Sequence, residues 1–113
     1  MKKIALTNEA YQIKSEYLDN GNVLTLTFNY RPNAFAWFVD IQYEGMIRKN
    51  IQLSAGTNIL RTFENIIPVD LYVKVSKIIG EAYILDSFAL GLAELYLVNF
   101  EERDAILNGE ISS

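Results

Sequence analysis

The strongest constraint on the fold is a pair of alternating segments, Val23–Tyr30 and Phe35–Tyr43, joined by a short turn at Pro32. In the first segment apolar residues occupy every second position, which is the period of a half-buried β-strand and not of a helix. One side of the second segment is wholly apolar and consists of Phe35, Trp37, Val39, Ile41 and Tyr43. Phe38 makes the opposite side partly apolar too. The sequence therefore predicts a β-hairpin with one buried face and a second face that another sheet or a partner chain covers.

Turn residues extend this hairpin into a meander. Asn20-Gly21 follows an alternating segment, Tyr11–Leu18, and predicts a type I′ hairpin turn in which both central residues have positive φ. Glu44-Gly45 forms a second tight connection, to a strand at Met46–Leu53. Within Tyr11–Leu18 the apolar and polar residues fall on opposite sides, with Tyr11, Ile13 and Tyr17 on one side and Gln12, Lys14 and Glu16 on the other.

The remaining periodic segments complete a small β-domain. Strands are expected at Lys2–Leu6, Val69–Val75 and Ala93–Phe100, a single helical turn at Glu81–Phe88, and a terminal helix at Glu101–Leu107. We predict that residues 1–113 form one all-β domain, a small antiparallel β-sandwich or partly open barrel with a β-meander and a short C-terminal helix.

The composition excludes several classes of function. The chain has no cysteine and no histidine, so disulfides, thiolate zinc sites and histidine-based catalytic sites are impossible. A net charge of −4 gives no general attraction to nucleic acid, and we expect no nucleic-acid partner. No apolar run approaches the roughly 20 residues of a membrane span, and the N-terminus does not resemble a signal peptide. These features predict a protein without membrane contact that is made in a cytoplasm.

Carboxylates are the main groups left for acid–base chemistry, and the candidates near strand ends or turns are Asp40, Glu44, Asp70, Glu81, Asp86 and Glu94. Because no pair has a diagnostic spacing, we interpret them as solvated or turn-forming acids. Asp19–Asn22 lacks the alternating ligands of a calcium loop, and Gly56-Thr57 lacks the spacing of a phosphate loop. We therefore predict no catalytic, cofactor or metal residues.

Aromatic residues offer an alternative kind of site. Tyr30, Phe35, Trp37, Phe38 and Tyr43 could stack on sugars or single-stranded bases, although most of them share the spacing of a buried face. Phe38 is the exception because it points away from Trp37, so it is either a contact with a second sheet or an interface anchor. The basic pairs Arg48-Lys49 and Lys74/Lys77 are interpreted as solvated strand positions.

Several stretches together resemble a known protein family over nearly the whole chain. They are Phe28-Asn29-Tyr30-Arg31, Trp37-Phe38-Val39-Asp40-Ile41, Gly56-Thr57-Asn58-Ile59-Leu60, Pro68-Val69-Asp70-Leu71-Tyr72-Val73, Asp86-Ser87-Phe88 and Leu95-Tyr96-Leu97. On these residues the chain resembles the central baseplate plug protein family of cyanophages and related contractile-tail bacteriophages. It departs from the family pattern at Ile78–Ala82 and in the acidic helix near its end.

The resemblance implies a non-enzymatic virion component that packs near the hub and tail tube of a tail baseplate. Its partners would be hub, tail tube or spike proteins, and it would occur in multiple copies in a symmetric assembly. Because large apolar side chains dominate interface energies, we predict Phe38 and Tyr72 as interface residues. The alternative is a carbohydrate- or peptide-binding β-module, and a carboxylate-based hydrolase is a third possibility.

Overall fold

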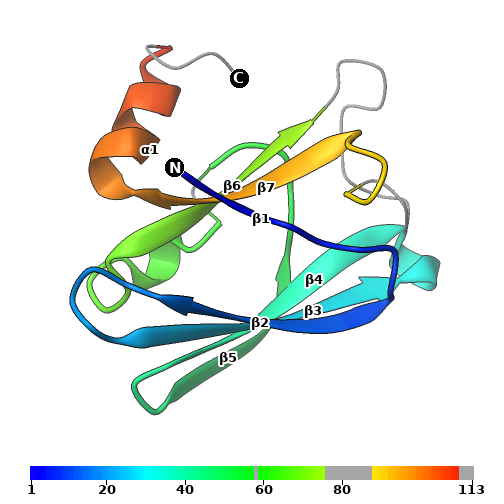
Figure 1. Ribbon diagram of the computed structural model, residues 1–113, viewed down its shortest axis with the longest axis horizontal. Coiled ribbons are helices and arrows are strands. Elements are labelled where there is room, and N and C mark those ends of the chain that lie inside the picture. Colours follow the sequence, from blue (N-terminus) through cyan, green and yellow to red (C-terminus); the bar gives the residue numbers. More distant parts are fainter. Residues whose placement is uncertain (58, 76–87, 110–113) are drawn as a thin grey trace.

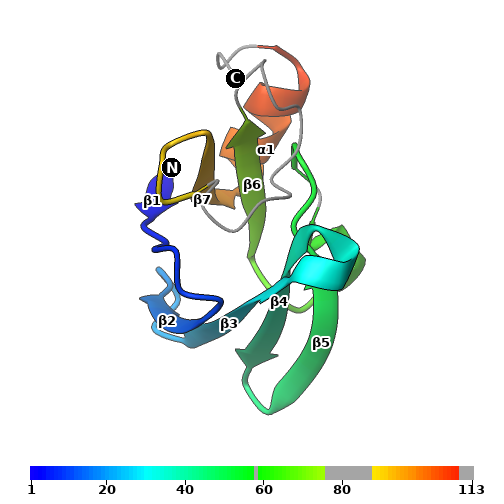
Figure 2. The same ribbon diagram turned by 90° about the vertical axis from the view of Figure 1, so that its right-hand side faces the viewer.

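The computed structural model describes residues 1–57, 59–75 and 88–109. In this part of the chain, seven strands form two antiparallel sheets that pack face to face as a sandwich (Figures 1 and 2). The elements are β1 (Lys2–Ile4), β2 (Tyr11–Tyr17), β3 (Val23–Arg31), β4 (Ala36–Tyr43), β5 (Met46–Gln52), β6 (Val69–Val75), β7 (Ala93–Asn99) and the helix α1 (Phe100–Leu107), with 3₁₀ turns at Pro32–Ala34 and Arg61–Phe63. The all-β fold with a short C-terminal helix is thus confirmed, and it is a sandwich rather than a closed barrel.

The larger sheet is the predicted meander, in the order β2-β3-β4-β5, and the smaller sheet has the order β1-β7-β6. Tight connections explain the antiparallel order of the meander, because each strand returns directly beside the one before it. The smaller sheet joins both ends of the described chain, since Lys3 of β1 pairs with Tyr96 of β7. The helical turn expected at Glu81–Phe88 lies outside the described residues, except for Phe88, which is buried in the core.

The hairpin turn at Asn20-Gly21 differs from the prediction. Leu18 N–H donates to Asn22 O at 2.9 Å, and only Gly21 has a positive φ, which makes this a three-residue loop and not a type I′ turn. The type I′ conformation instead occurs at Glu44-Gly45, where φ is 47° and 82°. Asn-Gly is compatible with both loops, so the sequence signal located the hairpin but not its turn type.

Phe35 does not share the buried face with Trp37, as the alternation had predicted. It ends the 3₁₀ turn with a left-handed φ of 49°, before β4 begins at Ala36, and 65% of it is exposed. The left-handed residue interrupts the alternation, so the side chain turns out to solvent. The prediction for Phe35 is therefore wrong, whereas Trp37, Val39 and Ile41 are fully buried as expected.

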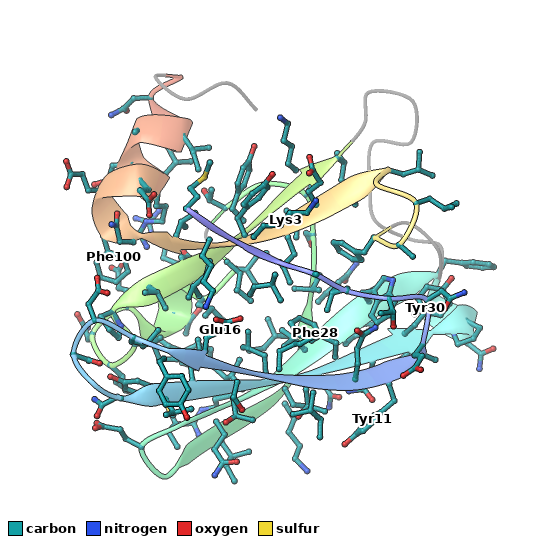
Figure 3. All side chains as sticks on the ribbon, viewed as in Figure 1. Lys3, Tyr11, Glu16, Phe28, Tyr30 and Phe100 are labelled. Atoms are coloured by element: carbon teal, nitrogen blue, oxygen red, sulfur yellow. The ribbon has the colours of Figure 1, made fainter. Side chains whose placement is uncertain are left out.

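The core fills the space between the two sheets. Alternate residues of β3 and β4 supply the lower half, and Phe28 points into this space in Figure 3. The upper half comes from the clean apolar face of β6, including Leu71 and Val73, together with Leu95 of β7. Trp37 of β4 lies against Phe88 edge to face, with ring centroids 5.8 Å apart, so the segment that precedes β7 packs on the larger sheet.

Helix α1 follows β7 without a loop and begins at a reciprocal capping box. Glu102 N–H donates to the Asn99 side chain at 2.7 Å, and Asn99 N–H donates to the Glu102 carboxylate at 3.0 Å. Burial alone would raise the pKa of Glu102, but the Asn99 N–H and the Met1 ammonium together lower the pKa below its usual value. The helix contacts β6 and β7. In the part of the chain that the structure describes, no helix has the length and hydropathy to cross a membrane.

Candidate protein-docking face

The face of the four-stranded sheet that points away from the core carries few charges and several exposed apolar side chains. We call it the outer sheet face, and it consists of Tyr11, Ile13, Ser15, Tyr17, Val23, Thr25, Thr27, Asn29, Arg31, Phe38, Asp40, Gln42, Ile47, Lys49 and Gln52. The strand register aligns these residues in rows, so Ile13 lies beside Thr27 and then Asp40. No described element covers this face in Figures 1 and 2. Its apolar side chains line β2 and recur at Phe38 and Ile47, on either side of the polar row of β3. Exposed apolar side chains gathered on an uncovered sheet face make it a candidate protein-interaction surface.

Strand β2 presents its apolar side to solvent and its polar side to the interior, the reverse of the usual arrangement. Ile13 is 55% exposed and Tyr17 is 79% exposed, whereas Gln12 and Glu16 are buried. Figure 3 shows Glu16 between the two layers and Tyr11 pointing away from them. A shift of one residue in the pairing with β3 would exchange these two sets, so the register is what exposes the apolar side.

Hydrogen bonds and an ion pair offset the unfavourable burial of the polar side of β2. The Gln12 side chain accepts from Thr7 N–H at 3.1 Å and donates to the carbonyl oxygens of Thr7 and Glu9 at 3.1 and 3.0 Å. The Glu16 carboxylate pairs with the Lys2 ammonium at 2.7 Å. Because these buried groups have partners, the isolated chain can hold β2 with its apolar side outward.

A shallow groove runs across the middle of the outer sheet face. Its volume is about 270 Å³, and its lining includes Tyr11, Thr27, Gln42, Ile47 and Lys49. Asp40 is also at the groove, but its carboxylate accepts from Asn50 N–H at 2.8 Å and so stabilises the bulge between β4 and β5. The groove therefore offers hydroxyl, amide and apolar groups, and no pair of free carboxylates for hydrolysis.

The two residues predicted as interface anchors lie on different sheets. Phe38 is half-buried on the outer sheet face, and the Arg31 guanidinium covers its ring at 4.4 Å. Tyr72 is on the smaller sheet, stacks on Tyr96 at a centroid distance of 6.0 Å and is only 3% exposed. The structure does not bring the two together, and Tyr72 offers almost no surface to a partner. Their contact with a partner stays a prediction.

Sequence reasoning missed the residues that supply most of the exposed apolar surface of the outer sheet face, namely Tyr11, Ile13, Tyr17 and Ile47. The signal was present as the alternation in Tyr11–Tyr17, which separates an apolar from a polar set. Alternation does not say which set faces the core, and hydrophobicity alone favours the opposite choice.

Most of the candidate carboxylates in the described residues have a structural explanation. Asp70 is fully buried, so its interpretation as a solvated acid is wrong. Its carboxylate accepts from the N–H groups of Leu60 and Leu71 at 2.8 and 2.7 Å and pairs with Arg103 of α1 at 3.3 Å. Asp70 therefore ties the helix and the preceding loop to β6.

Glu94 lies on β7 beside the Lys3 ammonium of β1, at 3.1 Å. A hydrogen bond from the Lys3 ammonium, reinforced by its charge, lowers the pKa of Glu94 despite partial burial. Tyr96 donates to the same carboxylate at 3.3 Å, and burial followed by this negative charge raises the pKa of Tyr96. Glu44 lies in the type I′ turn, while Glu81, Asp86 and Lys77 lie outside the described residues. Within residues 1–57, 59–75 and 88–109, no group of three or more acidic side chains could hold a metal ion.

Comparison with known proteins assigns the chain to a family. No curated protein matches it. The sequence model of the family described as cyanophage baseplate Pam3 plug gp18 matches residues 1–101 of the 113, which include both sheets and the outer sheet face. The chain therefore belongs to the cyanophage baseplate plug family.

Proposed function

We propose that this protein is a structural plug of a contractile phage tail baseplate and packs against hub or tail tube proteins through the outer sheet face. The family supports a place in the tail baseplate of the virion, among other baseplate components. One observation carries the choice of surface, which is the reversed burial of β2. Exposing Tyr11, Ile13 and Tyr17 to water is unfavourable in the isolated chain, and a partner that covers them recovers that free energy.

The rest of the proposal concerns where the protein is made, its copy number and how it acts. The protein is made in the host cytoplasm and enters the virion in several copies, together with hub, tail tube or spike proteins. It acts without catalysis, since the family is described as a plug and the chain has neither histidine nor cysteine. Uncharged side chains dominate the outer sheet face, so packing rather than electrostatic attraction supplies the affinity.

One observation favours a second candidate, a carbohydrate- or peptide-binding module. The groove beside Tyr11 combines an aromatic ring with threonine hydroxyls and the Gln42 amide, which are groups that bind sugars. The groove is shallow, however, and the family match gives this candidate no support.

The test is co-expression and co-purification with tail tube, hub and spike proteins of a contractile phage tail. Ile13→Glu places a charge in the outer sheet face and should reduce co-purification at least about tenfold, because a desolvated unpaired charge is costly. Ile66→Glu is the matched control, since Ile66 is 53% exposed, close to the 55% of Ile13, and lies outside this face. Phe38→Glu should also fold, and its co-purification with the baseplate proteins should likewise be reduced.

Three results would contradict the proposal. If Ile13→Glu co-purifies as well as Ile66→Glu, the outer sheet face is not the docking surface. If Phe38→Glu unfolds, Phe38 belongs to the folded framework and not to the interface. If the wild-type chain binds none of the baseplate proteins but binds a member of a glycan array, and Tyr11→Ala abolishes that binding, the carbohydrate-binding module is correct.

A further inference from the structure

The backbone of β2 has an unused edge. Tyr30 N–H donates to Ala10 O, and Leu18 N–H donates to Asn22 O, at the two ends of the β2–β3 ladder. Because hydrogen bonding alternates along an antiparallel ladder, Gln12, Lys14 and Glu16 direct their backbone groups to β3. The residues between them, Tyr11, Ile13, Ser15 and Tyr17, therefore turn their N–H and C=O groups away from the sheet. Among the described residues, nothing bonds to these outward groups.

The opposite edge of the same sheet is protected. On β5 the Arg48 guanidinium donates to the free carbonyl of Ile47 at 2.9 Å. A register shift and the left-handed Asn50, with φ of 64°, then interrupt the strand. Charged side chains and bulges of this kind prevent the addition of another strand.

The edges of the smaller sheet are also unsuitable. On β6, Val73 exchanges two hydrogen bonds with Gly56, at 2.8 and 3.0 Å. On β1 the strand is only three residues long and begins with Lys2 and Lys3. In the part of the chain that the structure describes, β2 is thus the long edge that is neither paired nor interrupted, over seven residues.

The side chains of β2 define what could pair with it. Three of the four outward-bonding residues, Tyr11, Ile13 and Tyr17, carry exposed apolar side chains of the outer sheet face, so apolar side chains on an added strand would continue this face. On the other side, Gln12 and Glu16 already have partners, whereas Lys14 makes no ion pair with any described residue. An acidic side chain opposite Lys14 would complete the row.

A second copy of this chain fits less well. Two β2 strands overlapping over their full length in antiparallel order would place Lys14 opposite Lys14, and each copy carries a net charge of −4. We propose that β2 accepts an extended segment of another baseplate protein as a fifth strand of the larger sheet, with apolar residues alternating and an acidic residue facing Lys14. This inference rests on the proposed function, because it specifies how the partner binds.

The decisive measurement is amide hydrogen exchange of Ile13 and Ser15, in the free chain and in the complex with the co-expressed tail tube, hub and spike proteins. In the free chain these amides should exchange at nearly unprotected rates, while Lys14 is protected by β3. In the complex, exchange of Ile13 and Ser15 should slow by about a hundredfold or more. Docking on the face alone would leave both amides fast.

Substitutions test the same point by binding. Ser15→Pro removes one outward N–H and leaves the β3 ladder intact, so it should fold but lose at least about tenfold in co-purification, whereas Ser15→Ala should not. Lys14→Glu should also weaken the complex, compared with Lys74→Glu on the other sheet, which makes the same change of charge. If Ser15→Pro fails to fold, the exchange rates of the wild-type amides still decide the question.

The outcomes separate this inference from the proposed function. Fast exchange of Ile13 and Ser15 in a complex that Ile13→Glu disrupts would overturn strand addition and leave docking through the face intact. Protection of the same amides in the isolated chain, together with the mass of a dimer, would identify a second copy as the occupant and overturn our choice of partner. Failure of the wild-type chain to bind any of the three proteins would overturn both.

Discussion

Truncation of Trp37 should remove a large part of the stability of this domain. Its side chain is fully buried between the sheets, and its ring meets Tyr30 at 5.6 Å and Phe88 at 5.8 Å. Replacing a buried Trp by Ala costs about 3 to 5 kcal/mol in total, and the two aromatic pairs, each worth about 0.5 to 1.5 kcal/mol beyond area burial, place Trp37 in the upper part of that range. We therefore expect Trp37→Ala to lower the free energy of unfolding by about 4 to 5 kcal/mol.

The assay is urea unfolding followed by far-ultraviolet circular dichroism, because Trp37 is the only tryptophan and its fluorescence is lost in the variant. Phe35→Ala is the matched control, since alternation assigns both aromatics to one face but the structure leaves Phe35 65% exposed. It should cost less than about 1 kcal/mol. Nearly equal losses in the two variants, or an unchanged midpoint in Trp37→Ala, would refute the assignment of Trp37 to the core.

Three further predictions concern the acidic residues. Asp70→Ala should lower the free energy of unfolding by about 3 kcal/mol, because it leaves the buried N–H groups of Leu60 and Leu71 without their acceptor and removes the buried partner of Arg103, while Asp104→Ala should change it little; urea unfolding measures both. Glu94 should contribute less than about 1 kcal/mol, measured as the difference between wild type and Glu94→Gln. Since folding lowers the pKa of Glu94, this contribution is present above its ordinary value of 4.5 and is lost as the pH falls through the lowered value. Calorimetry should detect no stoichiometric calcium binding, and a glycan panel no turnover; either signal, abolished by one carboxylate substitution, would contradict a structural role.

The central hairpin could be predicted from the sequence because its periodicity has one interpretation. Leu24, Leu26 and Phe28 alternate with polar residues, so only one face of β3 can be buried. The same reasoning was wrong for Phe35, because the left-handed conformation at the end of a turn changes the direction of the side chain and leaves the apolar–polar alternation of the sequence unchanged. Local backbone geometry, and not hydrophobicity, decided that position.

The environment of β6 could not be predicted because it depends on packing between distant elements. Asp70 and Tyr72 lie on the side of β6 that faces away from the core, where alternation predicts exposure. Arg103 of α1 instead reaches Asp70, and Tyr96 of β7 stacks on Tyr72. No short-range pattern encodes contacts between residues more than twenty positions apart in the chain. The sequence therefore places these two side chains on a strand but does not predict that they are buried.

The orientation of strand β2 could not be predicted from its sequence pattern either, and this orientation bears on the proposed function. Its pattern predicts a strand, but its orientation is decided by Lys2, Thr7 and Glu9, which supply partners for the polar side. If the chain had only to fold alone, burying Tyr11, Ile13 and Tyr17 would be the more stable choice, because polar Gln12 and Glu16 lose nothing in water. Holding the opposite orientation with specific contacts leaves an apolar face and a bare backbone edge on the same residues. Both are unfavourable in water and favourable against a partner, which is the combination that a strand-adding interface requires.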